Sequence, residues 1–369
     1  MTQENVVLEE AKPDLPPPGL VGGPVAWSKK NLFATPLDTV FTLIAAYALW
    51  RFVPPMLDWL IFSAQFSGTS RDACANIEGA CWALINARFG FLMFGFYPEP
   101  ERWRPILAFV LLILVILPIL FARLPGQRIA RWGLLLYPFV AFYLLRGGLG
   151  LPAVETSRWG GLMLTLALSV VAIAVSLPFG ILLALGRRST LPVIRFFAIG
   201  FIELVRAVPL VNVLFMASLM LPLFLPEGIT IDQVLRAMVG LSLFASAYMA
   251  EVIRGGLQAI PKGQYEAAKA MGLSYWQSMR LIVLPQALKI VIPGIVNTFI
   301  GMFKDTSLVA IIALFDLLGT AKSSVTNADW LGYDKEAYVF AALVYFTFCF
   351  SMSRYSIYLE KRLQTGHKR

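Results

Sequence analysis

The sequence predicts an all-helical integral membrane protein. Of its 369 residues, 58% are hydrophobic and only 14% are charged, whereas about a quarter of the residues of a soluble domain are charged. The mean hydropathy is +0.71, and long apolar stretches recur along most of the chain. This composition excludes an ordinary soluble domain and indicates several membrane spans.

The span bounds follow from the thickness of a bilayer, whose hydrocarbon core of about 30 Å needs about 20 mostly apolar helical residues. The clearest span lies between Arg158 and Arg187, where no charge interrupts the chain. The shortest uncharged core lies between Arg131 and Arg146. We expect eight spans, give or take one. Their approximate bounds are residues 38–60, 105–122, 130–146, 159–186, 195–225, 235–256, 286–312 and 337–358.

Both ends of the chain are expected in the cytoplasm. Residues 1–36 lack apolar periodicity and indicate a disordered tail without a cleavable signal peptide, and residues 361–369 form a second tail. With both termini inside, 19 Lys and Arg lie on inside segments and 10 on outside segments, while Arg51 and Arg206 fall within spans. The net charge of +9 therefore reflects topology and lipid headgroups, and no patch supports nucleic-acid binding.

The same topology places residues 61–103 outside, as a small ordered cap that contains Cys74 and Cys81. Their short separation and an oxidising compartment favour a disulfide, and two free thiols in an apolar cap are the alternative. Cys349 lies in the last span and is expected to pack as an apolar residue. His367 is the only histidine and no cysteine cluster has metal spacing, so no metal site is predicted.

The chain carries no sequence signature of a catalyst. The phosphate-binding loop GxxxxGK[ST], the nucleophile elbow GxSxG and the zinc motif HExxH are all absent. We therefore expect no catalytic residue and no cofactor in this chain.

One polar segment interrupts the apolar chain at residues 257–285, which the topology places in the cytoplasm. Gln264 to Met271 favours a helix, and Gly272 suits the position that follows a helix end. Ser274 to Gln277 forms a capping box for a second helix that we expect to stop at Pro285. The pattern predicts two helices joined by a turn outside the bilayer, shaped to dock into a partner. On local grounds alone, a surface loop that happens to be helical explains the same residues equally well.

The spacing in this segment decides between the two readings. It resembles the EAA-x3-G-x9-I-x-L-P motif of bacterial ABC importer permeases. In that family the motif forms coupling helices seated in a groove of the ATPase subunit. The resemblance implies coupling helices at about 261–284 and assigns ATPase coupling to Glu266, Ala267, Ala268, Gly272, Leu284 and Pro285.

Neighbouring segments resemble the polar amino-acid permeases. These are the stretches beginning at Trp159, Glu203, Tyr248 and Phe303. The resemblance implies a type I importer fold with a five-span core at 159–360. The long extension at 37–158, with three spans, is similar to the general L-amino-acid permeases.

Two departures from the family pattern lie in the fifth span. Arg206-Ala207-Val208-Pro209 stands where Arg-Gly-Thr-Pro is usual, and Val213 replaces a common glutamine. They weaken the transfer of substrate contacts from that helix.

The intramembrane charges need partners or a wet cavity, because a charge at a helix centre costs about 2.5–3.5 kcal/mol on insertion scales. Glu203 with Arg206, and Glu251 with Arg254, are i,i+3 pairs that can neutralise each other on one helix. We interpret both pairs as structural or gating contacts near the cytoplasmic side. Arg51 has no such partner and is expected to snorkel or to meet another subunit.

The seventh span carries a polar, glycine-rich stripe of Gly294, Asn297, Gly301 and Lys304. Such a stripe lines a pathway or packs closely on a neighbour. A pairing of Lys304 with Asp305, or with a partner permease, is the competing interpretation. The groups expected along a substrate path are Glu251, Asn297, Thr298, Asp305, Thr306 and Ser307.

The combined prediction is the permease subunit of an ABC importer that moves L-amino acids across a bacterial inner membrane by alternating access. The resemblance implies four kinds of partner: ATPase subunits that carry ATP and Mg²⁺, a second permease subunit giving a heterodimer, a periplasmic solute-binding protein and membrane lipid. A secondary transporter coupled to an ion gradient is the alternative, but it would leave the coupling helices without a purpose. A membrane scaffold or receptor is a third class, which the polar stripe disfavours.

Overall fold

The computed structural model describes residues 23–121, 124–226 and 228–363. The predicted tails at 1–36 and 361–369 therefore lie largely outside the described residues. Within the described part, seven helices are long and apolar enough to cross a membrane, or eight if one bent pair counts as one span. The same residues form helices joined by turns, with only isolated β-bridges. The predicted fold class and number of spans are confirmed.

The described residues divide into two compact units, 23–65 with 76–81, and 66–75 with the described part of 82–363. The first unit holds α1 (Pro24–Asn31) and α2 (Pro36–Leu57), and α2 runs on into a π-helical turn at Asp58–Phe62. No residue of α2 is buried. In a membrane, an apolar helix of this kind meets lipid or another chain.

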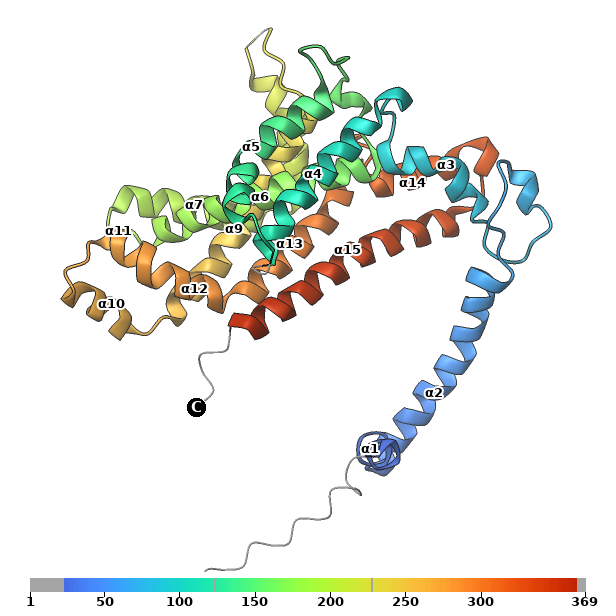
Figure 1. Cartoon of the computed structure of the whole chain (residues 1–369), viewed down its shortest axis with the longest axis horizontal. Coiled ribbons are helices and arrows are strands. Elements are labelled where there is room, and N and C mark those ends of the chain that lie inside the picture. Colours follow the sequence, from blue (N-terminus) through green and yellow to red (C-terminus); the bar gives the residue numbers. More distant parts are fainter. Residues whose placement is uncertain (1–22, 122–123, 227, 364–369) are drawn as a thin grey trace, which may run out of the picture. The chain divides into compact units, whose positions relative to one another are not determined.

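The second unit holds the remaining helices and can be followed in Figure 1, where α3 and α14 lie at one end and α10 and α11 at the other. Its helices are α3 (Ala83–Phe94), α4 (Trp103–Leu120), α5 (Gln127–Arg146), α6 (Gly161–Arg187), α7 (Pro192–Ala207), α8 (Leu210–Phe215), α9 (Gln233–Ala259), α10 (Lys262–Ala270), α11 (Tyr275–Ser278), α12 (Leu284–Ile290), α13 (Ile292–Asp305), α14 (Leu317–Thr326) and α15 (Asp334–Leu363).

The pair α6 and α9 forms the centre of this unit. A Cβ atom added at Gly180 of α6 would lie 2.7 Å from the Cβ atom of Met249 of α9, so only glycine permits this approach. Ser242, Ala245 and Ala250 of α9 are also buried. Small residues let membrane helices approach closely and gain dispersion contacts, which replace the hydrophobic driving force that lipid does not supply.

A buried arginine holds the hairpin of α4 and α5 together. The Arg104 side chain is fully buried, and its Nε donates to the Leu144 carbonyl at 2.7 Å. Its Nη1 donates to the Pro152 carbonyl at 2.8 Å and lies 3.2 Å from Glu101. Tyr97 packs against the guanidinium. One end of α4 is thereby tied to the far end of α5, although the Nη2 atom of Arg104 is buried without a hydrogen-bond partner.

The predicted fifth span at 195–225 is not a single straight helix. Its first part, Pro192–Ala207, meets the second part, Leu210–Phe224, at an angle of 107°. The break coincides with Val208 and Pro209, both in extended backbone conformations. Pro209 lacks the N–H that would continue the helix, and it disfavours the α conformation at Val208.

The predicted seventh span at 286–312 is also broken, at Val291 between α12 and α13. Pro293 lies in the first turn of α13, where its missing N–H leaves no helical bond unmade. The span begins at Ile292 and continues after Asp305 as a tighter 3₁₀ turn to Ile312.

The three cysteines differ in their state. Cys349 of α15 is a free, partly buried thiol. Cys74 and Cys81 are 4% and 0% exposed, and neither is a free thiol. The pairing of Cys74 with Cys81 remains a prediction.

We expect mass mapping of alkylated, unreduced protein to give one cross-linked peptide containing Cys74 and Cys81, and an alkylated Cys349. The short segment between the two cysteines makes ring closure easy, which favours this pairing. Recovery of alkylated Cys74 and Cys81 from folded protein would contradict it.

Candidate functional site

The polar segment forms two short helices, as predicted. The Ser274 hydroxyl accepts from the Gln277 N–H at 3.4 Å, and the Gln277 side chain accepts from the Ser274 N–H at 2.9 Å. This capping box starts α11. Gly272 has φ +73°, the left-handed conformation that ends α10, and nothing lies within 4 Å of a Cβ atom added there. The elbow is therefore set by local chemistry.

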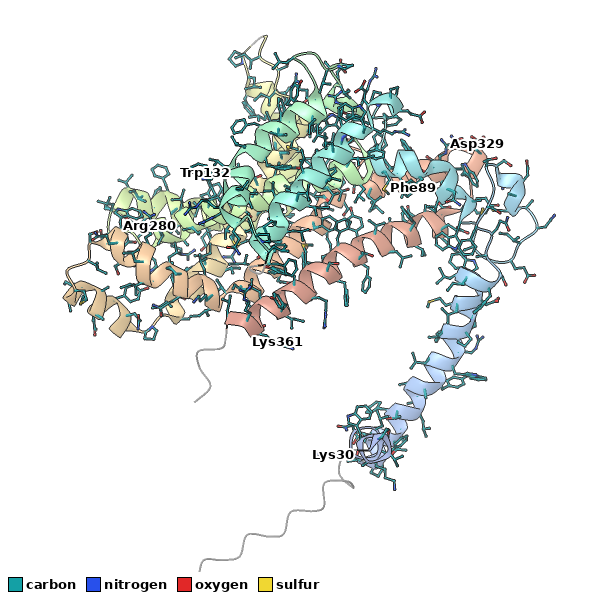
Figure 2. The ribbon with its side chains drawn as sticks, viewed as in Figure 1. Lys30, Phe89, Trp132, Arg280, Asp329 and Lys361 are labelled. Carbon is teal, nitrogen blue, oxygen red and sulfur yellow. The ribbon has the colours of Figure 1, made fainter. Side chains whose placement is uncertain are left out.

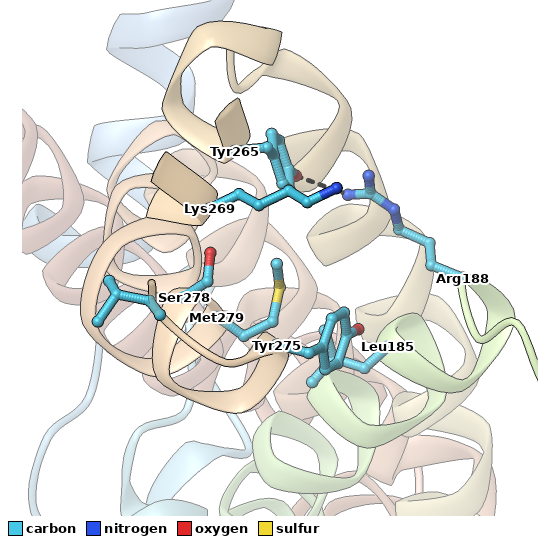
Figure 3. A pocket seen from close by; sticks show the side chains of 8 residues that line it. Leu185, Arg188, Tyr265, Lys269, Tyr275, Ser278 and Met279 are labelled. Carbon is cyan, nitrogen blue, oxygen red and sulfur yellow. Dashed lines mark hydrogen bonds between the residues drawn. The ribbon is translucent and has the colours of Figure 1, made fainter. Parts of the chain in front are cut away.

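The Arg188–Tyr265 tether attaches α10 to the membrane-spanning helices. Arg188, just beyond α6, donates from Nη1 to the Tyr265 hydroxyl at 2.9 Å and to the Leu257 carbonyl at 3.2 Å. The Tyr265 hydroxyl donates to the same carbonyl at 3.1 Å. The guanidinium also lies 5.4 Å from the ring centroid. This tether, drawn in Figure 3, links the ends of α6 and α9 to α10.

Two further contacts hold α10 to the rest of the segment. Gln286 of α12 donates to the Gln264 side chain at 3.1 Å and to the Ile282 carbonyl at 2.9 Å. Ala268, the third residue of the predicted motif, is fully buried. A larger side chain at Ala268 would push α10 away from its support.

A hollow of about 440 Å³ lies beneath the tether. Arg188 and Lys269 supply its cations, and Tyr265, Tyr275 and Ser278 supply its hydroxyl groups (Figure 3). No acidic residue lines it. The residues that line the hollow come mainly from the end of α6, from α10 and from α11.

The outer side of the helix pair is exposed and apolar. Met271 is 79% exposed, Trp276 is 65% exposed and Leu281 is 63% exposed. Glu266 and Ala267 are exposed beside them. We call the exposed residues Glu266, Ala267, Met271, Tyr275, Trp276 and Leu281 the docking surface. Large apolar side chains gathered on a polar segment mark an interaction site.

Pro285 does not stop the second helix, contrary to prediction. It lies in the first turn of α12, after a π-helical turn at Met279–Val283. A proline is tolerated in a first turn because its missing N–H would have no helical partner there. Leu284 is partly buried and Pro285 is exposed.

An ion network lies at the ends of α6, α7 and α9. Arg187 Nη1 is 2.8 Å from both Glu203 and Glu251. Glu251 also meets Arg254 at 2.8 Å and Arg206 at 3.6 Å. Three guanidinium groups therefore surround one carboxylate, which is 16% exposed.

This network corrects the predicted pairing within each helix. Glu251 and Arg254 do pair, but Glu203 pairs with Arg187 of α6 instead of Arg206. Arg206 turns to Glu251 and lies 5.7 Å from the Tyr248 ring centroid. Contacts between helices thus replace one contact within a helix, so the network holds three helix ends together.

The polar residues of the seventh span do not form one cluster. Asn297 is exposed and Asp305 is partly buried. The hydroxyls of Thr298 and Ser307 donate to carbonyls of their own helical turns. Thr306 is fully buried and donates to the Phe303 carbonyl at 2.7 Å. Asn297 and Asp305 are therefore the two members with polar groups left for a ligand.

The predicted polar stripe faces away from the chain's own packing along most of its length. Asn297 and Lys304 are exposed, and nothing lies within 4 Å of a Cβ atom added at Gly301. Only Gly294 packs tightly, against Val252. The stripe is thus open to a pathway or to another chain. Glu251, predicted as a second acceptor, is instead engaged by arginines.

Two groups of important residues were missed from the sequence. Arg187 and Arg188 counted there only as topology charges, because their partners are distant in the chain. Asp316 caps α14 by accepting from the Gly319 N–H at 2.9 Å, and it also accepts from the Tyr345 hydroxyl at 2.9 Å. An aspartate three residues before a glycine at a helix start was the available signal. Among the described residues, no His, Cys, Asp and Glu gather as a metal site.

The chain is similar to known membrane transport proteins. Residues 176–365 match the family described as "Binding-protein-dependent transport system inner membrane component". The chain is 52% identical over 345 residues to the "Inner membrane amino-acid ABC transporter permease protein YhdY" of Escherichia coli, covering 93% of this chain and 94% of that protein. It is 41% identical to the "Glutamate/glutamine/aspartate/asparagine transport system permease protein BztC" of Rhodobacter capsulatus, covering 100% of both.

Among solved structures, the chain is similar to the one titled "Crystal structure of an amino acid ABC transporter with histidines". The match covers 55% of this chain and 92% of the chain in that structure. The identity is 32% and the TM-score is 0.49.

The ion network predicts unequal effects of its two carboxylates. Replacing Glu251 with Gln should leave three crowded guanidinium groups and lower stability by about 1–3 kcal/mol, since the site is partly buried. Glu203→Gln should cost at most about 1 kcal/mol, because this side chain is 54% exposed. Thermal unfolding in detergent measures both. Equal losses would contradict the network's centre at Glu251.

Proposed function

Because this chain belongs to the family of binding-protein-dependent transport system inner membrane components, we propose that it is the permease subunit of an ABC importer for amino acids. The observation that carries this proposal is the docking surface, a set of mostly apolar exposed side chains on a polar helix pair that adjoins the membrane spans in sequence. Both relatives above are named as amino-acid transport permeases.

The proposed role of the chain is to convert ATP hydrolysis by a partner subunit into movement of its membrane helices. It lacks a phosphate-binding loop, so an ATPase subunit would bind ATP and Mg²⁺ and hydrolyse the nucleotide. That ATPase would seat the docking surface in a groove, a helix-in-groove contact anchored by apolar side chains. Coupling would run through Glu266, Ala267, Ala268, Gly272, Leu284 and Pro285.

The further assembly follows the same logic. A second permease subunit would cover the open stripe of α13, making a heterodimer, and an external solute-binding protein would deliver an L-amino acid. We place the protein in a bacterial inner membrane with both termini in the cytoplasm, on the distribution of its Lys and Arg residues. A secondary transporter would give the docking surface no role.

The tether supplies a route for the movement. Displacement of α10 would pull on Arg188 and on the Leu257 carbonyl, and hence on the ends of α6 and α9. The ion network next to them would then hold α6, α7 and α9 together as they move. Alternating access would arise as these helices rock against the companion permease.

The substrate path is proposed along α13. An amino acid presents an ammonium and a carboxylate, so a site for it needs an acceptor near one end and donors near the other. Asp305 offers the acceptor and Asn297 offers an amide, while Thr298 and Ser307 lie on the same helical segment. The open side at Gly301 leaves room for variable side chains.

Changes in the helix pair should uncouple transport from hydrolysis. Glu266→Lys reverses a charge on the docking surface, and Gly272→Leu puts a bulky side chain at the left-handed turn between the two helices. We expect either change to lower amino-acid uptake about tenfold or more, the scale of a typical coupling free energy. Insertion and folding should survive, because both residues lie outside the apolar core. Uptake into proteoliposomes measures transport, and ATP hydrolysis by the purified complex measures the ATPase activity.

Asp334→Lys, an equal charge reversal at the start of α15, is the matched control and should leave uptake unchanged. Parental uptake by the Glu266→Lys protein, inserted normally, would remove the docking assignment.

Loss of polar groups along α13 should lower transport without changing assembly with the ATPase or its basal hydrolysis. Asn297→Ala and Asp305→Asn are each expected to reduce uptake about tenfold, since hydrogen bonds to charged groups contribute about 1.5–3 kcal/mol. Co-purification with the ATPase and basal hydrolysis should stay at the parental level. Thr347→Ala is the control, because that exposed hydroxyl only donates to the Leu343 carbonyl. Unchanged uptake of several amino acids by both variants would move the site elsewhere, to the companion subunit first.

A further inference from the structure

The helix α5 has two faces with opposite chemistry. Its inner face packs on α4: Ala130 is 6% exposed, Gly133 lies against Val115, and the Tyr137 hydroxyl donates to the Ala108 carbonyl at 3.3 Å. Its outer face is exposed. That face carries Arg128, Arg131, Trp132 and Leu135 near the helix start, and Phe139 and Phe142 beyond them.

The first four of these residues, which we call the basic face, line a hollow of about 430 Å³. Trp132 is 66% exposed and Leu135 is 63% exposed. Within the part of the chain that the structure describes, neither Arg128 nor Arg131 forms an ion pair. Figure 2 labels Trp132 on this helix. The basic face thus offers two free cations, an indole and an apolar surface in series.

The depth of the basic face matches a membrane border. Arg128 and Arg146 are 18 positions apart, which spans about 27 Å of helix and is close to the hydrocarbon thickness of about 30 Å. Near the start of α5, the Tyr355 hydroxyl of α15 donates to the Leu120 carbonyl, and Phe121 packs on Tyr358. Tryptophan and tyrosine gather at the level of lipid headgroups.

We infer that the basic face binds the phosphate headgroup of an anionic phospholipid. The two guanidinium groups would pair with the phosphate, the Trp132 ring would lie at the glycerol level, and Leu135 and Phe139 would contact an acyl chain. Charge complementarity selects this occupant, because the lining holds two positive charges and no acidic residue. The inference gives the N-terminal extension a role in lipid contact and does not depend on the transport assignment.

Native mass spectrometry of the full-length chain in detergent tests this proposal. The probes are phosphatidylglycerol and phosphatidylcholine with identical acyl chains, added at equal concentration. The parent should retain phosphatidylglycerol in preference. Each cation near an anionic headgroup contributes about fivefold, so Arg128→Gln with Arg131→Gln should lower that preference about 25-fold. Arg128→Lys with Arg131→Lys should retain most of it.

The control is Arg71→Gln with Lys262→Gln, which removes two exposed charges that lie outside the candidate membrane spans and should leave the preference unchanged. Equal lipid preference in the parent and the Arg128, Arg131 double glutamine variant would overturn the proposal. A photo-crosslinker at Trp132 gives an independent readout in the native membrane. A lipid adduct supports the site, and an adduct to another protein chain would overturn it.

Discussion

The last turn of α6 connects the apolar body of this protein to its polar helix pair. Arg187 and Arg188 are adjacent in sequence but serve different partners. Arg187 contacts the carboxylates of α7 and α9, and Arg188 holds the Tyr265 hydroxyl of α10. The close packing of α6 on α9 keeps both arginines in place, because Gly180 allows the two backbones to meet. This double contact adds to the Gln286–Gln264 bond and the buried Ala268 in holding α10 in place.

The sequence predicts the features that depend on local chemistry. The capping box at Ser274, the left-handed Gly272 and the positions of most spans all follow from residues close to one another in the chain. The coupling role of this segment rests on the motif spacing and stays a prediction. The expected stop at Pro285 was wrong, because proline fits a first helical turn as well as a helix end. The local preference of proline therefore could not decide whether the helix ends or a new one begins at Pro285.

Features that depend on distant contacts could not be predicted in the same way. Glu203 has Arg206 at helical spacing, yet Arg187 sits closer once α6 and α7 pack together. The buried Arg104 and the Asp316–Tyr345 bond likewise join residues that are 29 or more positions apart. For the substrate path, spacing placed Asn297 on one stripe with Thr298 and Asp305 adjacent to it, but only Asn297 of these three is exposed.

The central claim is that the docking surface seats an ATPase subunit, and site-specific photo-crosslinking tests it most directly. A photo-reactive amino acid at Met271, which is 79% exposed, should form an adduct with a chain that carries a phosphate-binding loop. The same group at Phe139 of α5, 74% exposed, should not form that adduct. A Met271 probe that yields no ATPase adduct, in a complex that still imports amino acids, would contradict the account.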